Sequence, residues 1–398
     1  MTKTSKPCVL IGITGGIAAY KICSLVSSLH KQGYEVHVLM TKEAQEFITP
    51  LTLQTLSGNK VILDMFSTDY TPEVHHISLA EKADVFVVAP ATANVIAKIA
   101  CGIADDMLTT TFLASDCEKL IVPAMNTHML ENPITQDNIQ KLRSYGMHIL
   151  ESAEGYLACG TTGKGRMPEP EVIEDAVKQL LFSDKFLAGK KVLITAGPTC
   201  EAIDPVRYVT NHSSGKMGYA LARAARNAGA DVTLVSGKTA LAPVAGVRMI
   251  PVVSAKDMAD AVLPLQKEMD LMILAAAVAD YTPATTAQEK IHKSDGGMTI
   301  AMNRTTDILK TLGAHKPEGQ ILVGFSMETE DLLANSTRKL ESKNCDYIVA
   351  NSLRQAGAGF GVDTNVVTII SRTRVDELGL MSKDETAETI LRTVMEEY

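Results

Sequence analysis

The sequence predicts an α/β protein made of two doubly wound domains, and three observations lead to this fold class. Continuous apolar segments alternate with helical patterns along most of the chain, which is typical of parallel strands covered by helices on both faces. The alternation starts again at Lys190 with a new apolar segment, KKVLI. The chain has 398 residues, which is enough for two to three domains. We therefore expect one domain at 1–189 and a second at 190–398.

The first domain is predicted to begin with a strand, a glycine turn and a helix. The strand CVLIGIT is followed by Gly15 and Gly16 and by the helix AAYKICSLVSSLHKQG, which ends at Gly33. Further apolar segments predict strands at 34–40, 83–90, 119–125 and 147–150. Residues 151–169 are rich in glycine and follow no period, so a loop is expected there. The helix EVIEDAVKQLLF then closes the domain.

The second domain is predicted to have a sheet of its own. Its apolar segments predict strands at 190–197, 230–237, 247–253, 270–280, 320–328 and 345–351. Open α/β sheets bind their ligands at the carboxyl ends of the strands. In both domains these ends are small or polar, as in ITGG, APATAN, PAMN, TAGPT, AAAVADY and GFSMET. We therefore expect the chemistry at these strand ends.

The connection ITAGPTCEAIDPVRYVTNHSSGKMG, from 194 to 218, is much longer than a turn between a strand and a helix requires. Gly215 and Lys216 supply the Gly-Lys pair of a phosphate-binding P-loop. However, Thr210 stands at the position of the motif's first glycine, and Met217 stands where Ser or Thr would hold Mg²⁺. An ordinary P-loop is therefore not expected.

Composition excludes several classes of protein. The net charge of −8 argues against a general affinity for nucleic acid or for an anionic membrane. Seven cysteines without a C-x-x-C pair suit a reducing compartment and offer no zinc framework. The N-terminal apolar run is broken by glycines, and the run at 271–279 is too short to span a bilayer. We expect a cytoplasmic protein.

A few residues of the first domain are candidates for chemistry, each with a structural alternative. The glycine turn departs from G-x-G-x-x-G, so it either holds one phosphate on its N–H groups or is only a turn. His76 is more often a satisfied surface or core histidine than a base. Asn126 could bind a carboxylate or cap the following helix. Cys159, in a glycine loop, is expected to be exposed enough to react.

Taken together, the motifs of the first domain resemble a known family. TGGIAAYK, HI, APATAN, PAMN and ACG…GRMPEP, in this order and spacing, resemble the flavin-dependent cysteine decarboxylases. In the second domain, ITAGPT, DPVRYVTNHSSGKMG, AAAVADY, EKI and GFSMET resemble phosphopantothenate–cysteine ligase. Nearly the whole chain is thus similar to the bacterial bifunctional phosphopantothenoylcysteine decarboxylase/phosphopantothenate–cysteine ligases of coenzyme A biosynthesis.

For the first domain the resemblance implies a flavodoxin-like or Rossmann-type flavoprotein that decarboxylates phosphopantothenoylcysteine to 4'-phosphopantetheine with FMN. In this family the flavin first oxidises the thiol end to a thioaldehyde, which can accept the electrons released with CO₂. His76 would be the base, Asn126 would bind the substrate carboxylate beside Met125, and Cys159 would deliver a proton. The expected flavin-binding residues are Thr14, Gly15, Thr41, Ala91, Thr92 and Asn94.

For the second domain the resemblance implies a Rossmann-like ligase that uses CTP with Mg²⁺, held largely by the phosphates. The carboxylate of 4'-phosphopantothenate would form an acyl-cytidylate with the help of Lys290, and Asn211 would be needed for its reaction with cysteine. Arg207 and the turn at Lys216 would meet the substrate phosphate or the dimer partner. The expected nucleotide-binding residues are Asp280, Lys290, Thr306, Asp307, Ile308, Leu309, Phe325, Lys339 and Lys343.

Alternatives remain for several of these residues. Asp280 could simply cap a turn, and Lys339 and Lys343, four residues apart, could form a solvated helix face. The sequence also departs from the family at His292, where relatives often have lysine. In the segment 305–308 Thr-Thr replaces the family's Asn-Pro.

The resemblance also implies an assembly. The decarboxylase half would form trimers with the flavin between subunits, the ligase half would form dimers, and both together would give a dodecamer. The partners are expected to be small molecules, with no nucleic acid and no membrane. Two other functions are conceivable: decarboxylation of a peptide's C-terminal cysteine, and a non-enzymatic role as a regulatory subunit. The fused ligase half disfavours the first, and the intact set of candidate residues disfavours the second.

Overall fold

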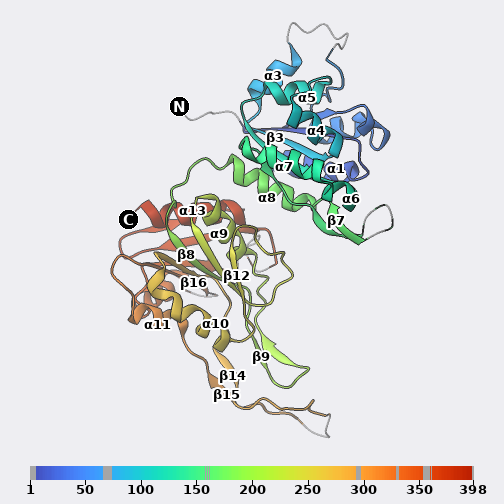
Figure 1. Ribbon diagram of the computed structural model, residues 1–398. Helices are drawn as coiled ribbons and strands as arrows, with labels where there is room; N and C mark the ends of the chain where they lie inside the picture. Colours follow the sequence, from blue (N-terminus) through green and yellow to red (C-terminus); the bar gives the residue numbers. More distant parts are fainter. Residues whose placement is uncertain are drawn as a thin grey trace. The chain divides into compact units, whose positions relative to one another are not determined.

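The computed structural model describes residues 6–65, 74–156, 158, 160, 162–292, 297–328, 331–352, 359 and 361–396. It divides into two compact units, Met1–Ser183 and Asp184–Tyr398, each with its own sheet (Figure 1). The division falls slightly before position 190 because Leu187 is buried in the second unit and its N–H donates to Ala228 O at 2.9 Å. In the described part of the chain, no helix is long and apolar enough to cross a bilayer.

The described part of the first unit contains one parallel five-stranded sheet in the order β2-β1-β3-β4-β5. Its strands are β1 (Cys8–Ile13), β2 (Glu35–Met40), β3 (Val85–Ala91), β4 (Glu118–Pro123) and β5 (His148–Ile149). This is the flavodoxin-like strand order, and it reverses between β1 and β3. The predicted fold class is confirmed, and open sheets of this kind bind ligands at the carboxyl ends of the strands that flank the reversal, here β1 and β3.

Helices cover both faces of this sheet, which explains why its strands are apolar throughout. In β1, Val9 and Ile11 belong to a core with α1 (Ala19–Lys31), α2 (Pro50–Ser57) and α8 (Pro170–Leu181). Leu10 belongs to the opposite core, which also contains apolar residues of α3, α4, α5 and α7. These four helices span His75–Lys82, Ala93–Cys101, Met107–Ala114 and Pro133–Ser144. Two shorter helices, η1 (Glu43–Glu46) and α6 (Thr127–Glu131), follow β2 and β4.

The glycine-rich segment expected to be a loop contains a β-hairpin, and this expectation was therefore wrong in part. Strand β6 (Ala153–Tyr156) pairs antiparallel with β7 (Thr162–Arg166). Most of its residues are exposed or half-buried, so the apolar alternation that marks a half-buried strand is absent from the sequence.

The described part of the second unit contains an eight-stranded sheet in the order β12-β11-β8-β13-β16-β17-β19-β20. The first six strands are parallel, and β19 and β20 extend the sheet in antiparallel fashion. The bounds are Arg248–Pro251, Asp231–Ser236, Lys191–Ala196, Leu271–Leu274, Ile321–Glu328, Tyr347–Ser352, Val367–Ile370 and Val375–Glu377. The parallel part has the Rossmann order, which reverses between β8 and β13.

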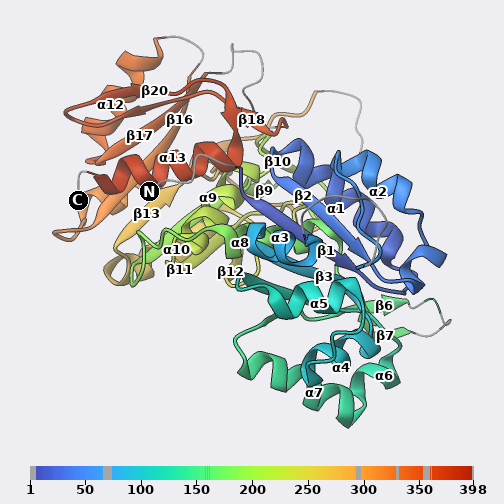
Figure 2. The same cartoon turned by 90° about the horizontal axis from the view of Figure 1, so that it is seen from above.

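Helices also cover both faces of the second sheet. On one face α9 (Lys216–Asn227) packs against β8 and β11 and lies beside α13 (Lys383–Glu396), as Figure 2 shows. The apolar core of the other face contains residues of α10, η2, α11 and α12. These helices span Ala255–Val262, Leu263–Glu268, Ile308–Ala314 and Leu332–Ser342.

Two small hairpins leave this sheet at its point of reversal. β9 (Cys200–Ala202) and β10 (Tyr208–Thr210) follow β8, and β14 (Tyr281–Pro283) and β15 (Met302–Arg304) follow β13. Strands β9 and β14 are in contact, and both hairpins project beyond the carboxyl ends of the strands (Figure 1). The long connection of the sequence is thus a hairpin arm. A third pair, β18 (Thr364–Asn365) and β21 (Met381–Ser382), precedes α13.

Candidate functional site

In the first unit, Thr14 joins the ends of the two strands at which the sheet order reverses. The residue follows β1 and is completely buried. Its hydroxyl donates a hydrogen bond to Pro90 O at 2.6 Å and accepts one from the Thr92 N–H at 3.1 Å. Because both groups belong to the end of β3 and the start of α4, one side chain holds the two sides of the crevice together.

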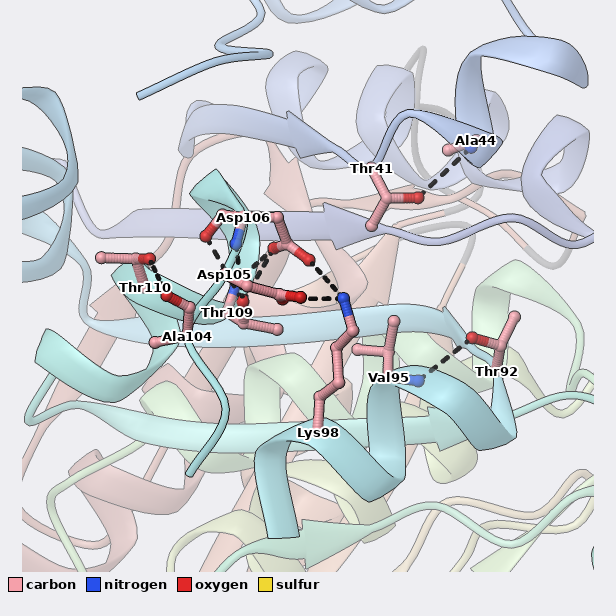
Figure 3. A network of polar contacts seen from close by, with 10 residues as sticks. All are labelled: Thr41, Ala44, Thr92, Val95, Lys98, Ala104, Asp105, Asp106, Thr109 and Thr110. Atoms are coloured by element: carbon pink, nitrogen blue, oxygen red, sulfur yellow. Dashed lines mark hydrogen bonds and ion pairs between the residues drawn. The ribbon is translucent and has the colours of Figure 1, made fainter. Parts of the chain in front are cut away.

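Gly15 and Thr41 bring the end of β2 to the same place. A Cβ atom on Gly15 would lie 2.4 Å from the Cβ of Glu43, so no side chain fits there without displacing η1. Thr41 is buried, and its N–H donates to Ile13 O at 3.0 Å. Its hydroxyl accepts the Ala44 N–H at 3.3 Å (Figure 3).

The start of α4 completes this arrangement. The Thr92 hydroxyl accepts the Val95 N–H at 3.4 Å and thereby caps the helix (Figure 3). Ala91 is buried, whereas Asn94 in the first turn is exposed. All six residues predicted to bind the flavin thus lie at the carboxyl ends of three adjacent strands and at the beginning of one helix: Thr14, Gly15, Thr41, Ala91, Thr92 and Asn94.

An ionic network that the sequence analysis missed lies at the other end of α4. Lys98 Nζ donates to Asp105 at 2.7 Å and to Asp106 at 3.3 Å (Figure 3). These bonds, above all the one to Asp105, raise the pKa of Lys98, and Lys98 lowers the pKa of Asp105. Asp106 also caps α5 by accepting the Thr109 N–H at 2.8 Å. The network therefore links the connection between the two helices to α4.

Asn126 follows β4 and lies against the β6–β7 hairpin. Its Oδ1 accepts the His128 N–H at 2.9 Å, so this atom has the capping role that the sequence left open. The neighbouring Met125 N–H donates to Gly165 O at 3.0 Å. A Cβ atom on Gly165 would lie only 2.1 Å from Met125 O. Strand β7 can approach this segment so closely only because glycine stands there.

Cys159 itself lies outside the described residues, in the segment between β6 and β7. Thr127 Oγ1 donates to Lys164 O at 2.7 Å, which attaches the hairpin on the other side of Asn126. Both contacts place the hairpin that carries Cys159 beside Asn126. His76 is half-buried in the first turn of α3, and among the described contacts none joins it to Asn126.

In the second unit, the segments that follow β8 and β13 run side by side. Ala277 N–H donates to Gly197 O at 2.9 Å, and Ala279 N–H donates to Thr199 Oγ1 at 3.0 Å. The exposed Asn211, just after β10, donates from Nδ2 to Ala277 O at 3.1 Å and to Val278 O at 3.4 Å. The arm therefore folds back and places this amide at the point where the sheet reverses.

Three glycines of the connection are required by its main-chain geometry and packing. Gly197 and Gly215 have left-handed φ angles of 74° and 79°, and a Cβ on Gly215 would lie 3.4 Å from Gly197 Cα. A Cβ on Gly218 would lie 2.5 Å from Ala196 Cβ, so α9 packs closely on β8. The pattern escaped the sequence analysis because residues 198–214 separate its first two glycines.

The structure also shows the contacts of Lys216. Its ammonium group donates to Asp363 Oδ1 at 2.6 Å and to Gly361 O at 3.1 Å. The lysine therefore secures the segment before β18.

The residues predicted to bind the nucleotide form two groups in the second unit. The first group lies beside the β14–β15 hairpin, and the second lies at β16 and the start of α11. Asp280 is exposed, and its carbonyl oxygen accepts the N–H of Thr305, next to the exposed Thr306. The carboxylate of Asp307 caps α11 by accepting the Lys310 N–H at 2.9 Å and also pairs with the Lys343 ammonium group.

Lys339 and Lys343 belong to this second group. Lys339 Nζ donates to the carbonyl oxygen of Phe325, the half-buried residue in β16, at 3.3 Å. Ile308 is buried, and Leu309 packs so closely that a Cβ on Gly324 would lie 2.6 Å from it. The two lysines therefore face β16 and the start of α11 and are half-buried; they are not a fully solvated surface.

Arg207 and Lys290 are connected through a residue that the sequence analysis did not single out. Asp204, in the turn of the β9–β10 hairpin, is buried and accepts hydrogen bonds from the Arg207 guanidinium group and from the Ile291 N–H. The guanidinium group, followed by main-chain N–H donors, holds the pKa of this carboxyl well below its usual range. Lys290 itself is exposed. Among the described residues, no group of three or more His, Cys, Asp or Glu is arranged to hold a metal ion.

Comparisons with known proteins match both units. The family described as "Flavoprotein" matches residues 1–182, and the family "DNA/pantothenate metabolism flavoprotein C-terminal domain" matches residues 187–398. The "Coenzyme A biosynthesis bifunctional protein CoaBC" of Bacillus subtilis (strain 168) is 50% identical over 390 residues, which cover 97% of this chain and 96% of that protein.

Two further relatives were found. A "Cysteine/Cysteine sulfinic acid decarboxylase" from an unknown prokaryotic organism is 47% identical over 354 residues, which cover 87% of this chain and 99% of the relative. A solved structure of the C-terminal domain of a coenzyme A biosynthesis bifunctional protein is 45% identical, with a TM-score of 0.47, over 54% of this chain and 98% of that chain.

Proposed function

This chain belongs to the family of bifunctional coenzyme A biosynthesis proteins, and we propose that its two units catalyse consecutive steps at the two strand-end sites described above. The protein is an enzyme of coenzyme A biosynthesis with a decarboxylase activity and a ligase activity. The second unit joins 4'-phosphopantothenate to cysteine at the expense of CTP. The first unit decarboxylates the resulting phosphopantothenoylcysteine to 4'-phosphopantetheine. The observation that supports this proposal is that some of the predicted residues of each unit lie where its sheet order reverses: Thr14 and Thr92 after β1 and β3, and Asn211 against the segment after β13.

The ligase reaction needs activation because a carboxylate oxygen is a poor leaving group. The carboxylate of 4'-phosphopantothenate attacks the α-phosphate of CTP, and pyrophosphate leaves. The amine of cysteine then attacks the acyl-cytidylate, and CMP leaves. Lys290 neutralises charge that develops in the first step, and Asn211, held at the reversal point by its hydrogen bond to Ala277, serves the second. Mg²⁺ is proposed to arrive with the CTP phosphates.

The proposed nucleotide site combines the two groups of residues described above. Asp280 and Thr306 lie on the side of the β14–β15 hairpin, whereas Phe325, Lys339 and Lys343 lie on β16 and α12. The two half-buried lysines would neutralise the triphosphate, since cations at this edge are already held in place by Asp307 and the Phe325 carbonyl. Asp307, Ile308 and Leu309 complete the proposed contacts.

The first unit fits a flavin mononucleotide. Flavodoxin-like sheets bind their ligand where the strand order reverses, here between β1 and β3, and the small or hydroxyl-bearing residues Thr14, Gly15 and Thr92 would hold the flavin phosphate there. When bound, FMN supplies the electron acceptor for the thiol end of the substrate and later returns the electrons. The chain belongs to a flavoprotein family.

Three side chains of the first unit bind the substrate and transfer its protons. Asn126 binds the substrate carboxylate beside Met125 and orients it for loss of CO₂. His76 removes a proton from the substrate. Cys159 delivers a proton to the decarboxylated product. The family resemblance implies a flavin bound between subunits, so self-association of this unit is part of the proposal. We propose trimers through this unit, dimers through the ligase unit and a dodecamer overall.

The purified full-length protein tests this proposal. Bound flavin should give a yellow absorbance spectrum, and CTP, 4'-phosphopantothenate and cysteine should together release pyrophosphate and then CO₂. Cys159→Ser should stop CO₂ release while ligation continues. Asn211→Asp should stop ligation while added phosphopantothenoylcysteine is still decarboxylated. A protein without flavin and without CTP-dependent turnover would overturn the proposal.

The relative named as a cysteine/cysteine sulfinic acid decarboxylase suggests two further substrates to compare. Free cysteine and cysteine sulfinic acid should lose CO₂ much more slowly than phosphopantothenoylcysteine. Equal or faster turnover of either compound would assign the first unit to a different reaction while leaving the ligase unit unaffected.

A further inference from the structure

Asp204 receives more hydrogen bonds than its own turn requires. Its Oδ1 accepts the N–H groups of Val206 and Arg207, both at 2.8 Å, which is the ordinary way in which an aspartate stabilises a turn. Its Oδ2 accepts Arg207 Nε at 3.0 Å and the N–H of Ile291 at 3.1 Å. The second oxygen therefore connects the hairpin to a segment far away in the sequence.

Arg207 completes this connection from the other side. Its Nη2 donates both to Asp204 and to Ile291 O, the latter at 2.7 Å. The N–H and the C=O of Ile291 are thus both bonded to the same aspartate–arginine pair. Asp204 is buried beneath these contacts, with an exposed fraction of only 2%. Lys290, immediately before Ile291, is exposed.

The segment before Lys290 is attached to the same hairpin. Ala287 N–H donates to Ile203 O at 3.0 Å, and Thr286 Oγ1 donates to Ala202 O at 3.2 Å. Successive contacts thus fix the course of the main chain on the way to Lys290. At its far end the hairpin continues into Asn211, which is bonded to Ala277 at the reversal point.

We propose that Asp204 is a positioning residue of the ligase reaction, which fixes Lys290 relative to Asn211 through Arg207 and the main chain of Ile291. This inference rests on the proposed roles of Lys290 and Asn211. An aspartate that only stabilised its own turn would need only the Oδ1 bonds, whereas the bonds to Ile291 also fix the main chain next to Lys290. A small displacement of a catalytic group can lower a rate by as much as about a hundredfold.

The test replaces Asp204 by asparagine in the full-length protein. An amide has one acceptor and one donor end, so in either orientation an NH₂ group would face N–H donors. Pyrophosphate release from CTP and 4'-phosphopantothenate without cysteine reports acyl-cytidylate formation. We expect the rate constant of this single turnover to fall at least tenfold. The CTP concentration that gives half of the maximal rate should change by less than about threefold, because the proposed nucleotide contacts other than Lys290 are on other segments.

Hydrogen exchange supplies a readout that does not depend on activity. In Asp204→Asn the peptide containing Ile291 should exchange faster, while peptides of β8 and β13 should keep their protection. Asp257→Asn is the matched control, since Asp257 is another carboxylate of this unit with a lowered pKa, and it only caps α10. This control should leave pyrophosphate release and the exchange of the Ile291 peptide unchanged.

Lys290→Gln distinguishes an error in the proposed role of Lys290 from an error in the proposed role of Asp204. If Lys290→Gln still forms the acyl-cytidylate at the wild-type rate, the proposed role of Lys290 is wrong. If Lys290→Gln is slow but Asp204→Asn is as fast as the wild type, only the positioning role is wrong. Should Asp204→Asn not fold, Arg207→Met keeps the turn bonds of Asp204 and removes the bridge to Ile291 O. Acyl-cytidylate formation at the wild-type rate in that variant would also overturn the inference.

Discussion

Gly165 of β7 lies so close to Met125 that a Cβ atom on the glycine would be 2.1 Å from the methionine carbonyl oxygen. The Met125 N–H also donates to Gly165 O at 3.0 Å. This contact holds the hairpin that carries Cys159 beside Asn126. It therefore joins a strand end of the sheet to a segment that the sequence analysis expected to be only a loop.

Gly165→Ala should move the hairpin and impair the decarboxylase alone. The φ angle of Gly165 is +124°, which other residues rarely adopt, so strain of about 1–3 kcal/mol adds to the steric clash. We expect CO₂ release to fall at least tenfold, with pyrophosphate release unchanged. Gly146→Ala is the control, because its φ of +84° is also left-handed but a Cβ there would meet nothing within 4 Å. Normal CO₂ release by Gly165→Ala would contradict the prediction.

Thr14→Val should weaken flavin binding. The substitution keeps the shape of the side chain but leaves the Pro90 carbonyl and the Thr92 N–H without their partner. Leaving buried polar groups unpaired costs about 1–3 kcal/mol. The flavin absorbance per protein should drop, and the first unit should unfold at a lower temperature. Thr55→Val, on the exposed face of α2, is expected to change neither measurement.

Lys339→Met and Lys343→Met should each weaken the binding of CTP. Both ammonium groups lie at the edge formed by β16 and α11, where we propose the triphosphate. Loss of one charge contact should raise the KM for CTP about tenfold, which corresponds to about 1.4 kcal/mol. Lys316→Met serves as the control, since Lys316 is also half-buried and paired, but with Asp346 at the start of β17. An unchanged KM in both site variants would place the triphosphate elsewhere.

The loss of folding stability of the second unit at acidic pH should depend in part on Asp204. The bonds from Arg207 and the main chain depress its pKa in the folded protein, so the unfolded chain takes up a proton at higher pH than the folded one. The stabilisation is therefore present above the usual aspartate pKa of about 3.9 and is lost as the pH falls through that value toward the folded pKa. Urea unfolding at pH 7 and at pH 3.5 should show a smaller difference in Asp204→Asn than in the wild type. An equal difference would show that the carboxylate adds nothing to the acid sensitivity.

The sequence predicted the two sheets well because their strands are buried on both faces and therefore read as continuous apolar segments. The predicted strands of 8–14 and 190–197 coincide with β1 and β8 to within a few residues. Exposed strands carry no such signal. The β6–β7, β9–β10 and β14–β15 hairpins and strand β20 were missed for this reason. Strand β19 was also missed, although its segment VTII is mostly buried and does carry the apolar signal.

Site residues at the ends of buried strands could be proposed from the sequence because their position in the fold is fixed by the strand. Thr14 and Thr92 are examples: the family resemblance named them, and each lies at or within two residues of the end of a predicted strand. Asp204 could not be found in the same way. An aspartate before a proline reads as an ordinary turn residue, and only the folded chain shows that its second oxygen reaches Ile291. The glycine pattern of Gly197, Gly215 and Gly218 was likewise visible only once the hairpin arm was seen to leave and return.

The close approach of Gly197 and Gly215 has a consequence for how this scaffold can be altered. Because the two ends of the 198–214 insertion meet, lengthening this closed loop adds little entropic cost. Changes in the length of the arm should therefore be tolerated where it makes no contact with the frame. Thr199 and Glu201 are excluded from such changes, since they accept the N–H groups of Ala279 and of Ala255 at the start of α10.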